Sequence, residues 1–187
     1  MSGEPLSRVT LFVAAGLAAV LVVGVIIASQ VLGDEDAAAP APTSTTELPP
    51  RPSGPLALVP VDAPDAGTPS CTNLVNALPA KLPSNGKDLT RLPIADPAPP
   101  GAAAWASDRG EPVVMRCGLG KPAEYKQTAQ LRQVNKVNWL PVEGDGATTW
   151  YTVDRPVYIA LTIPDDAGTG VVQEMSDTIA KAVPPAA

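Results

Sequence analysis

Ser84 and Lys87 stand three residues apart, which is the S-x-x-K spacing of the serine nucleophile in penicillin-binding enzymes. That chemistry places the hydroxyl and the amine one helical turn apart, so that the amine helps to activate the hydroxyl. Here Pro83, Asn85 and Gly86 predict a turn, and neither S-D-N nor K-T-G follows downstream. The residues around Ser84 and Lys87 therefore favour a turn over a serine nucleophile.

The chain contains no histidine. This excludes a Ser-His-Asp triad, a Cys-His pair, an HExxH zinc site and any acid–base step that uses imidazole. Its two cysteines are too few for a four-cysteine zinc site. We assign no catalytic residue, no metal site and no cofactor, and we expect that the protein is not an enzyme. The alternative is a small envelope hydrolase or transferase using carboxylates or a Ser–Lys pair; its candidates are Ser84, Lys87, Asp108, Glu111 and Asp154.

Val9–Gly33 is an uncharged apolar segment, and it predicts the cellular compartment of the rest of the chain. About 20 apolar residues in a helix cross the hydrocarbon core of a bilayer. Residues 1–8, with Arg8, precede the segment, and we expect them in the cytoplasm with the bulk of the chain outside. A cleaved signal peptide ending near Ala37–Ala39 is the alternative, although the segment is longer than the roughly 7–15 residues of a signal core. The favoured hypothesis is a single-pass anchor in the cell membrane.

Residues 34–55 are rich in proline, alanine and threonine, with six prolines. This composition cannot bury enough apolar surface to offset chain entropy and predicts a disordered linker, either bare or glycosylated. Residues 56–187 are then long enough for one extracytoplasmic domain. They carry eleven Lys and Arg against fourteen Asp and Glu, so the domain has no basic excess and no nucleic-acid partner is expected.

Cys71 and Cys117 are the two cysteines, and both lie in this domain. Outside the cytoplasm an isolated pair of cysteines is most simply a disulfide. A redox-active pair would normally have C-x-x-C spacing. We therefore predict a structural disulfide.

The hydrophobic pattern of residues 56–187 predicts an α+β domain, a mostly antiparallel sheet packed by two helices. We expect a helix capped by Ser70 with Cys71, Leu74, Val75 and Leu78 on its apolar face, and a final helix capped by Thr169. A helical turn is expected at Ala102–Trp105. The expected strands are an edge strand at Leu56–Val61, then Pro112–Cys117, Thr128–Val134, Val137–Val142, Thr148–Val153 and Val157–Ile163.

Two sets of side chains are candidates for a ligand surface. The tryptophans could form a stacking platform for sugars or lipids, but aromatic residues in a sheet are more often part of the core. The arginines could form an anion site, but scattered surface ion pairs are the more common arrangement. The candidates are Trp105, Trp139, Trp150, Arg91, Arg109, Arg116 and Arg155.

With these residues the chain resembles a family of uncharacterised membrane-anchored proteins from actinobacteria, a domain of unknown function. The resemblance is carried by Cys71 with Leu74 and Leu78-Pro79, by Trp105, by Arg116-Cys117-Gly118, by Val137-Asn138-Trp139 and by Asp154-Arg155-Pro156-Val157. It implies a location and a fold grouping rather than a mechanism. The functional hypothesis is a non-enzymatic binding or interaction module of the cell envelope. Its expected contacts are the membrane, through the N-terminal helix, and an envelope protein, glycan or lipid. A lipid or small-molecule carrier is the further alternative, and it needs an apolar cavity of at least about 300 Å³.

Overall fold

The computed structural model describes Arg51 and residues 54–186 of the chain, all within the compact unit Glu47–Ala187. The predicted membrane span Val9–Gly33 and nearly all of the predicted linker lie outside the described residues. Among the helices that are described, none is long and apolar enough to span a membrane.

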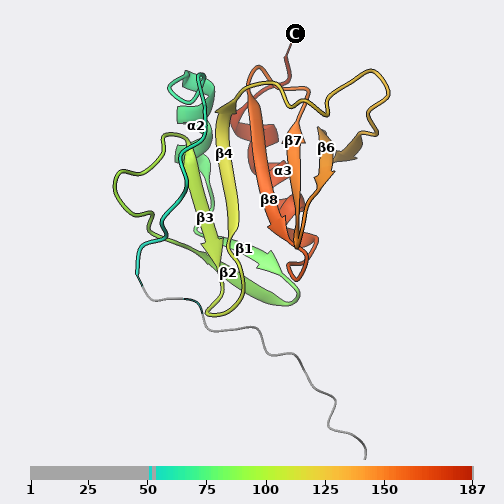
Figure 1. Cartoon of the computed structure of the whole chain (residues 1–187). Helices are drawn as coiled ribbons and strands as arrows, with labels where there is room; N and C mark the ends of the chain where they lie inside the picture. Colours follow the sequence, from blue (N-terminus) through green and yellow to red (C-terminus); the bar gives the residue numbers. More distant parts are fainter. Residues whose placement is uncertain (1–50, 52–53, 187) are drawn as a thin grey trace, which may run out of the picture. The chain divides into compact units, whose positions relative to one another are not determined.

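One antiparallel sheet of eight strands carries the domain, in the order β1-β2-β3-β4-β8-β7-β6-β5 (Figure 1). Strands β1 to β4 follow one another across the sheet, and β5 to β8 return from the opposite edge, so that β4 and β8 pair at the centre. The strands are β1 Lys81–Ser84, β2 Lys87–Arg91, β3 Ala102–Ala106, β4 Val113–Leu119, β5 Arg132–Val134, β6 Val137–Glu143, β7 Ala147–Thr152 and β8 Tyr158–Pro164.

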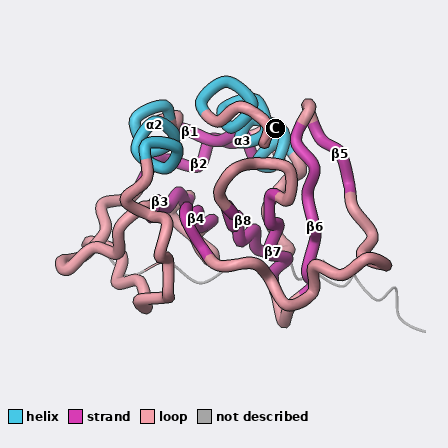
Figure 2. The backbone as a smooth tube through the Cα atoms, turned by 90° about the horizontal axis from the view of Figure 1, so that it is seen from above, coloured by secondary structure: helices cyan, strands magenta, loops and turns pink. Residues whose placement is uncertain are grey.

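Two helices, α2 Pro69–Ala77 and α3 Gly170–Ala182, pack on one face of this sheet (Figure 2). α3 contacts α2, β1 at one edge of the sheet, and β5 and β6 at the other edge, so the sheet curves around this helix. Met175 and Ile179, one helical turn apart on α3, are fully buried. The α+β prediction of an antiparallel sheet with two helices is confirmed.

Strand β8 illustrates how the apolar side chains of one sheet face pack against the helices. Alternate side chains point to opposite faces of a strand, and the apolar set of β8 is buried against the helices. Ile159 and Leu161 are fully buried and oppose Cys117 and Met115 of β4 in the central pair. The predictions for Pro112–Cys117 and Val157–Ile163 are confirmed, with bounds shifted by one or two residues.

Two tight turns join neighbouring strands. Asn135 and Lys136 connect β5 to β6 with φ of 44° and 67°, as the paired strands around them predicted. Asn85 and Gly86, with φ of 49° and 75°, connect β1 to β2 in the same way. The turn at Asn85 and Gly86 was expected, but the hairpin on either side of it was not.

Three local predictions are wrong. Ala102–Trp105 is not a helical turn but belongs to β3, because it pairs with both β2 and β4 and is largely buried between them. Leu56–Val61 is not a strand; only Leu56 forms an isolated bridge, with Ile94, and Val59 is 77% exposed. Ser70 is not the helix cap, because Pro69 occupies the first turn and the cap falls on Thr68.

Candidate functional site

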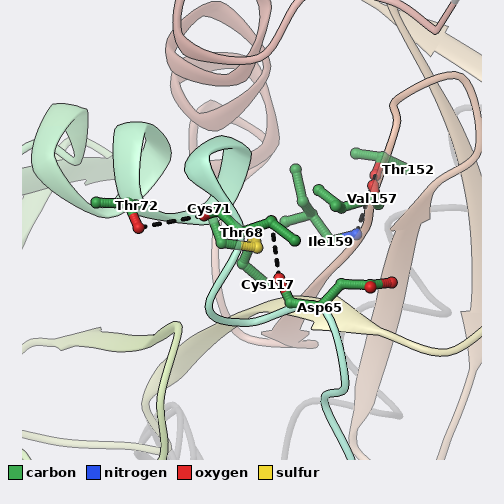
Figure 3. The surroundings of a disulfide bond; sticks show 8 residues. All are labelled: Asp65, Thr68, Cys71, Thr72, Cys117, Thr152, Val157 and Ile159. Atoms are coloured by element: carbon green, nitrogen blue, oxygen red, sulfur yellow. Dashed lines mark hydrogen bonds between the residues drawn. A yellow bond between two sulfur atoms is a disulfide. The ribbon is translucent and has the colours of Figure 1, made fainter.

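The disulfide joins Cys71 of α2 to Cys117 of β4, with a Cα–Cα distance of 5.6 Å, and confirms the predicted pairing (Figure 3). Both cysteines are fully buried. The segment before α2 is held against the same strand, since Asp65 N donates to Gly118 O at 3.0 Å. Gly118 has φ +87°, and an added Cβ would lie 2.2 Å from Ala66 N. The disulfide and the close backbone approach at Gly118 therefore hold α2 and the segment before it against β4, at the centre of the sheet.

The three tryptophans do not form a ligand surface. Trp105 and Trp139 are fully buried, which contradicts their place on such a surface. Trp105 Nε1 donates to Pro79 O and Trp139 Nε1 donates to Ser176 Oγ, each at 2.9 Å. Trp150 packs edge to face on Trp139, with ring centroids 6.4 Å apart. Their indole N–H groups and rings hold the sheet and helices together, as the core alternative predicted.

Each of the four candidate arginines lies in different surroundings. The guanidinium of Arg91 lies over the Trp105 ring, and Arg116 Nη2 donates to Val59 O at 2.8 Å. Burial lowers the pKa of the Arg116 guanidinium from its ordinary value. Arg155 is buried and Nη2 donates to Lys136 O at 2.6 Å, which contradicts a ligand-surface role for this residue. Arg109 lines a surface pocket.

Of the five residues of the enzymatic alternative, two are held in structural hydrogen bonds, one is exposed, and two line the same surface pocket. Ser84 is buried and its Oγ accepts a hydrogen bond from Gly168 N at 2.9 Å. Ser84 and Lys87 face each other across the β1–β2 turn rather than along a helix. Asp154 Oδ2 accepts from Asn138 N at 3.0 Å, while Glu111 is exposed. Asp108 lines the same pocket as Lys87 and Arg109.

That pocket, here called the β2–β3 pocket, has a volume of about 600 Å³. It falls within the range of roughly 300–1,000 Å³ that is usual for small-molecule sites. Its lining comes from strands β2 and β3, from the loop that follows β3, and from Arg51. Its lining residues are Arg51, Lys87, Asp88, Thr90, Leu92, Ala106, Ser107, Asp108 and Arg109.

Arg51 reaches the pocket from the segment that precedes the domain. Its backbone N donates to Asp108 O at 3.1 Å, and its guanidinium Nη1 donates to Ser107 O. Ser107 Oγ in turn donates to Arg109 O at 2.6 Å. These hydrogen bonds hold the loop in place and bring Arg51 and Arg109 to one wall of the pocket.

The charges of the pocket favour an anion. Arg51, Lys87 and Arg109 face two carboxylates, and one of these, Asp88, forms an ion pair with Lys81 at 3.2 Å. Lys81 does not line the pocket, so it supplies a fourth cation from outside. The cationic excess is local, because residues 56–187 as a whole are acidic.

Two smaller surface pockets have different chemistry. One of about 210 Å³ lies between Trp150 and the first turn of α3, and another of about 360 Å³ lies between the β5–β6 turn and Lys181. In the part of the chain with described coordinates, no three His, Cys, Asp or Glu side chains gather as a metal ion would require. The β2–β3 pocket is therefore the best candidate site.

Sequence reasoning identified part of this pocket only. Arg109 was proposed for an anion site and Lys87 for a different chemistry, whereas Arg51 was assigned to the linker. The available signal for Lys87 was its position directly after Asn85-Gly86, because a turn of this kind is followed by a strand. No local pattern joins Arg51 to Asp108, because this contact links residues far apart in the sequence.

Comparison with known proteins gives one match. A family model described as "Protein of unknown function (DUF3515)" covers residues 15–187. No curated protein and no solved structure matches the chain.

Proposed function

Since the chain belongs to the DUF3515 family, a family of proteins of unknown function, we propose its role from the domain itself. We propose a membrane-tethered, non-enzymatic binding module of the actinobacterial cell envelope. The N-terminus would be cytoplasmic, Val9–Gly33 would span the membrane once, and residues 56–187 would lie outside. A partner would bind in the β2–β3 pocket.

The observation that carries this proposal is the buried Cys71–Cys117 disulfide. Structural disulfides persist in oxidising compartments and are rare in the cytoplasm. An uncharged segment of sufficient length to cross a bilayer precedes the domain. Together they support a domain that is exported and remains attached to the membrane.

The contacts of the polar side chains support binding rather than catalysis. The side chains of Ser84 and Asp154, two of the candidates for catalysis, already accept hydrogen bonds from the backbone N–H groups of Gly168 and Asn138. The β2–β3 pocket has the volume and the mixed polar and apolar lining of a ligand site. A pocket of this kind, lined by paired strands of the sheet, suits recognition of an envelope component.

Site-specific photo-crosslinking in intact cells tests the binding role. A photoreactive residue replaces Thr90, on the pocket floor, in the full-length chain; the control carries it at Lys126, an exposed position that does not line the pocket. We expect a discrete crosslinked product from position 90 that is absent from position 126. Equal labelling from both positions, or none from position 90, contradicts a ligand site in this pocket.

A further inference from the structure

We propose that the β2–β3 pocket binds the phosphate group of a polyol phosphate, a phosphate ester whose organic part carries hydroxyl groups. This inference rests on the proposed binding function and names the chemical class of ligand for the same pocket. The ligand could be a free polyol phosphate or the headgroup of an anionic phospholipid, and both share this chemistry.

The first argument is the fixed position of the cations. Arg51 is attached to the β3–β4 loop through Ser107 O and Asp108 O. Lys87 follows the β1–β2 turn, which is held from the side because Asn85 Nδ2 donates to Asp166 O at 2.9 Å. Cations that are already positioned lose less conformational entropy when a ligand binds.

The second argument is the number and type of cations. Two arginines and one lysine line a single pocket, and arginine binds phosphate through paired N–H donors while lysine acts as a point charge. The negative charge of Asp88 only weakly reduces the attraction of these cations for an anion, because the Lys81 ammonium lies 3.2 Å from the Asp88 carboxylate. Three cations match a phosphate group of one to two negative charges better than a single carboxylate.

The third argument concerns the rest of the lining. The pocket is large enough for an organic group beside the phosphate. Asp108 supplies a carboxylate that accepts hydrogen bonds from hydroxyl groups, and Leu92 and Ala106 supply an apolar floor. The lining therefore offers groups for a phosphate and groups for a hydroxylated carbon chain in one pocket.

The position of the pocket agrees with either source of the ligand. Arg51 is the described residue nearest in sequence to the predicted membrane span, which ends at Gly33. The pocket thus lies where the chain enters the domain from its predicted attachment.

Chemical footprinting of lysines tests the inference on the full-length chain. The protein is placed in nanodiscs of phosphatidylcholine, and the acylation rates of Lys87 and Lys126 are measured by mass spectrometry. sn-Glycerol 3-phosphate is titrated, with glycerol as the matched uncharged probe. We expect glycerol phosphate to slow acylation of Lys87 saturably, by at least about threefold, and to leave Lys126 unchanged. Glycerol should protect neither lysine.

A variant supplies the affinity readout, measured by isothermal titration calorimetry because it lacks the lysine that the footprint follows. Lys87→Gln removes one charge-assisted contact from an exposed side chain and should weaken glycerol phosphate binding by about tenfold. Lys126→Gln should bind as the parent does, and matching melting temperatures would show that both variants are folded. An unchanged affinity in Lys87→Gln overturns the inference.

A second arm distinguishes the source of the phosphate. Nanodiscs containing phosphatidylglycerol protect Lys87 without added ligand if the headgroup enters the pocket. Protection by glycerol phosphate alone supports a free ligand. Protection in neither arm overturns the phosphate proposal; a discrete crosslink from position 90 in the same protein would still support the binding function.

Discussion

The guanidinium of Arg155 and the carbonyl of Lys136 are joined by a hydrogen bond of 2.6 Å beneath the β5–β6 turn. Arg155 Nε also lies 3.5 Å from Asp154 Oδ1, and the Arg155 side chain is only 1% exposed. Asp154 Oδ2 meanwhile accepts from Asn138 N of β6. The Asp-Arg pair between β7 and β8 therefore holds the neighbouring β5–β6 hairpin in place.

Replacing Arg155 should destabilise the domain. Arg155→Ala leaves the Lys136 carbonyl without its donor and the Asp154 carboxylate without its ion-pair partner, and we expect the free energy of unfolding to fall by about 2–4 kcal/mol. Arg132→Ala changes an exposed arginine on β5 and should cost less than about 0.5 kcal/mol. Urea unfolding of both variants measures the difference. Similar losses in the two would show that the buried contact has no special importance.

Gly118 should not tolerate a side chain. A Cβ there would overlap Ala66 N at 2.2 Å, and the φ of +87° disfavours any L residue. Gly118→Ala should lower the free energy of unfolding by at least about 2 kcal/mol. Gly120→Ala is the matched control, because nothing lies within 4 Å of its added Cβ. Thermal unfolding that ranks the two variants equally contradicts the close approach at Gly118.

The β5–β6 turn should be improved by glycine. Lys136 has φ of 67°, a conformation that glycine adopts without steric cost. Lys136→Gly should raise the free energy of unfolding by up to about 1 kcal/mol, because relief of the left-handed strain of about 1–2 kcal/mol exceeds the entropy that glycine adds to the unfolded chain. Chemical denaturation provides the test, and a decrease in stability would argue against the positive φ.

Tyr151 gives a dependence on pH. Burial, and then the charge of Glu124, raises the pKa of the Tyr151 phenol above its ordinary value of 10.0. The folded state thus holds this proton more tightly than the unfolded state does. The stability that results is fully present below pH 10.0 and is lost as the pH rises through the folded pKa.

Two variants test this linkage. Tyr151→Phe should show a smaller loss of stability above pH 10 than the parent. Glu124→Gln should bring the tyrosine pKa back toward its ordinary value without abolishing the effect of burial. Absorbance of the tyrosinate form during a pH titration measures the pKa directly. An unchanged titration in Tyr151→Phe would mean that another tyrosine carries the shift.

Much of the sheet and the last helix could be predicted from local patterns. β8 alternates apolar and polar residues, and α3 repeats its apolar residues at helical spacing, so each pattern identifies both the element and its buried face. The cysteine pair could be predicted because only one pairing exists. Such features depend on residues that are close in sequence or few in number.

The remaining features depend on tertiary contacts. The run Ala102–Ala104 favours a helix by propensity, but pairing with β2 and β4 makes it a strand. The pocket needs Arg51 to reach Asp108, and no pattern along the chain reports that contact. Scattered ion pairs were the favoured prediction for the arginines over a shared anion site, but their actual partners, such as the Trp105 ring and Lys136 O, are decided by the fold.

The redox state of Cys71 and Cys117 in intact cells tests the central claim most directly. Thiols are trapped in living cells with a permeant alkylating reagent, the disulfides are then reduced and labelled with an isotopically heavy reagent, and peptides are quantified by mass spectrometry. The account predicts that both cysteines carry the heavy label, as an oxidised pair in an exported domain. Both cysteines carrying the first, light label would mean free thiols in the native protein and would contradict the account.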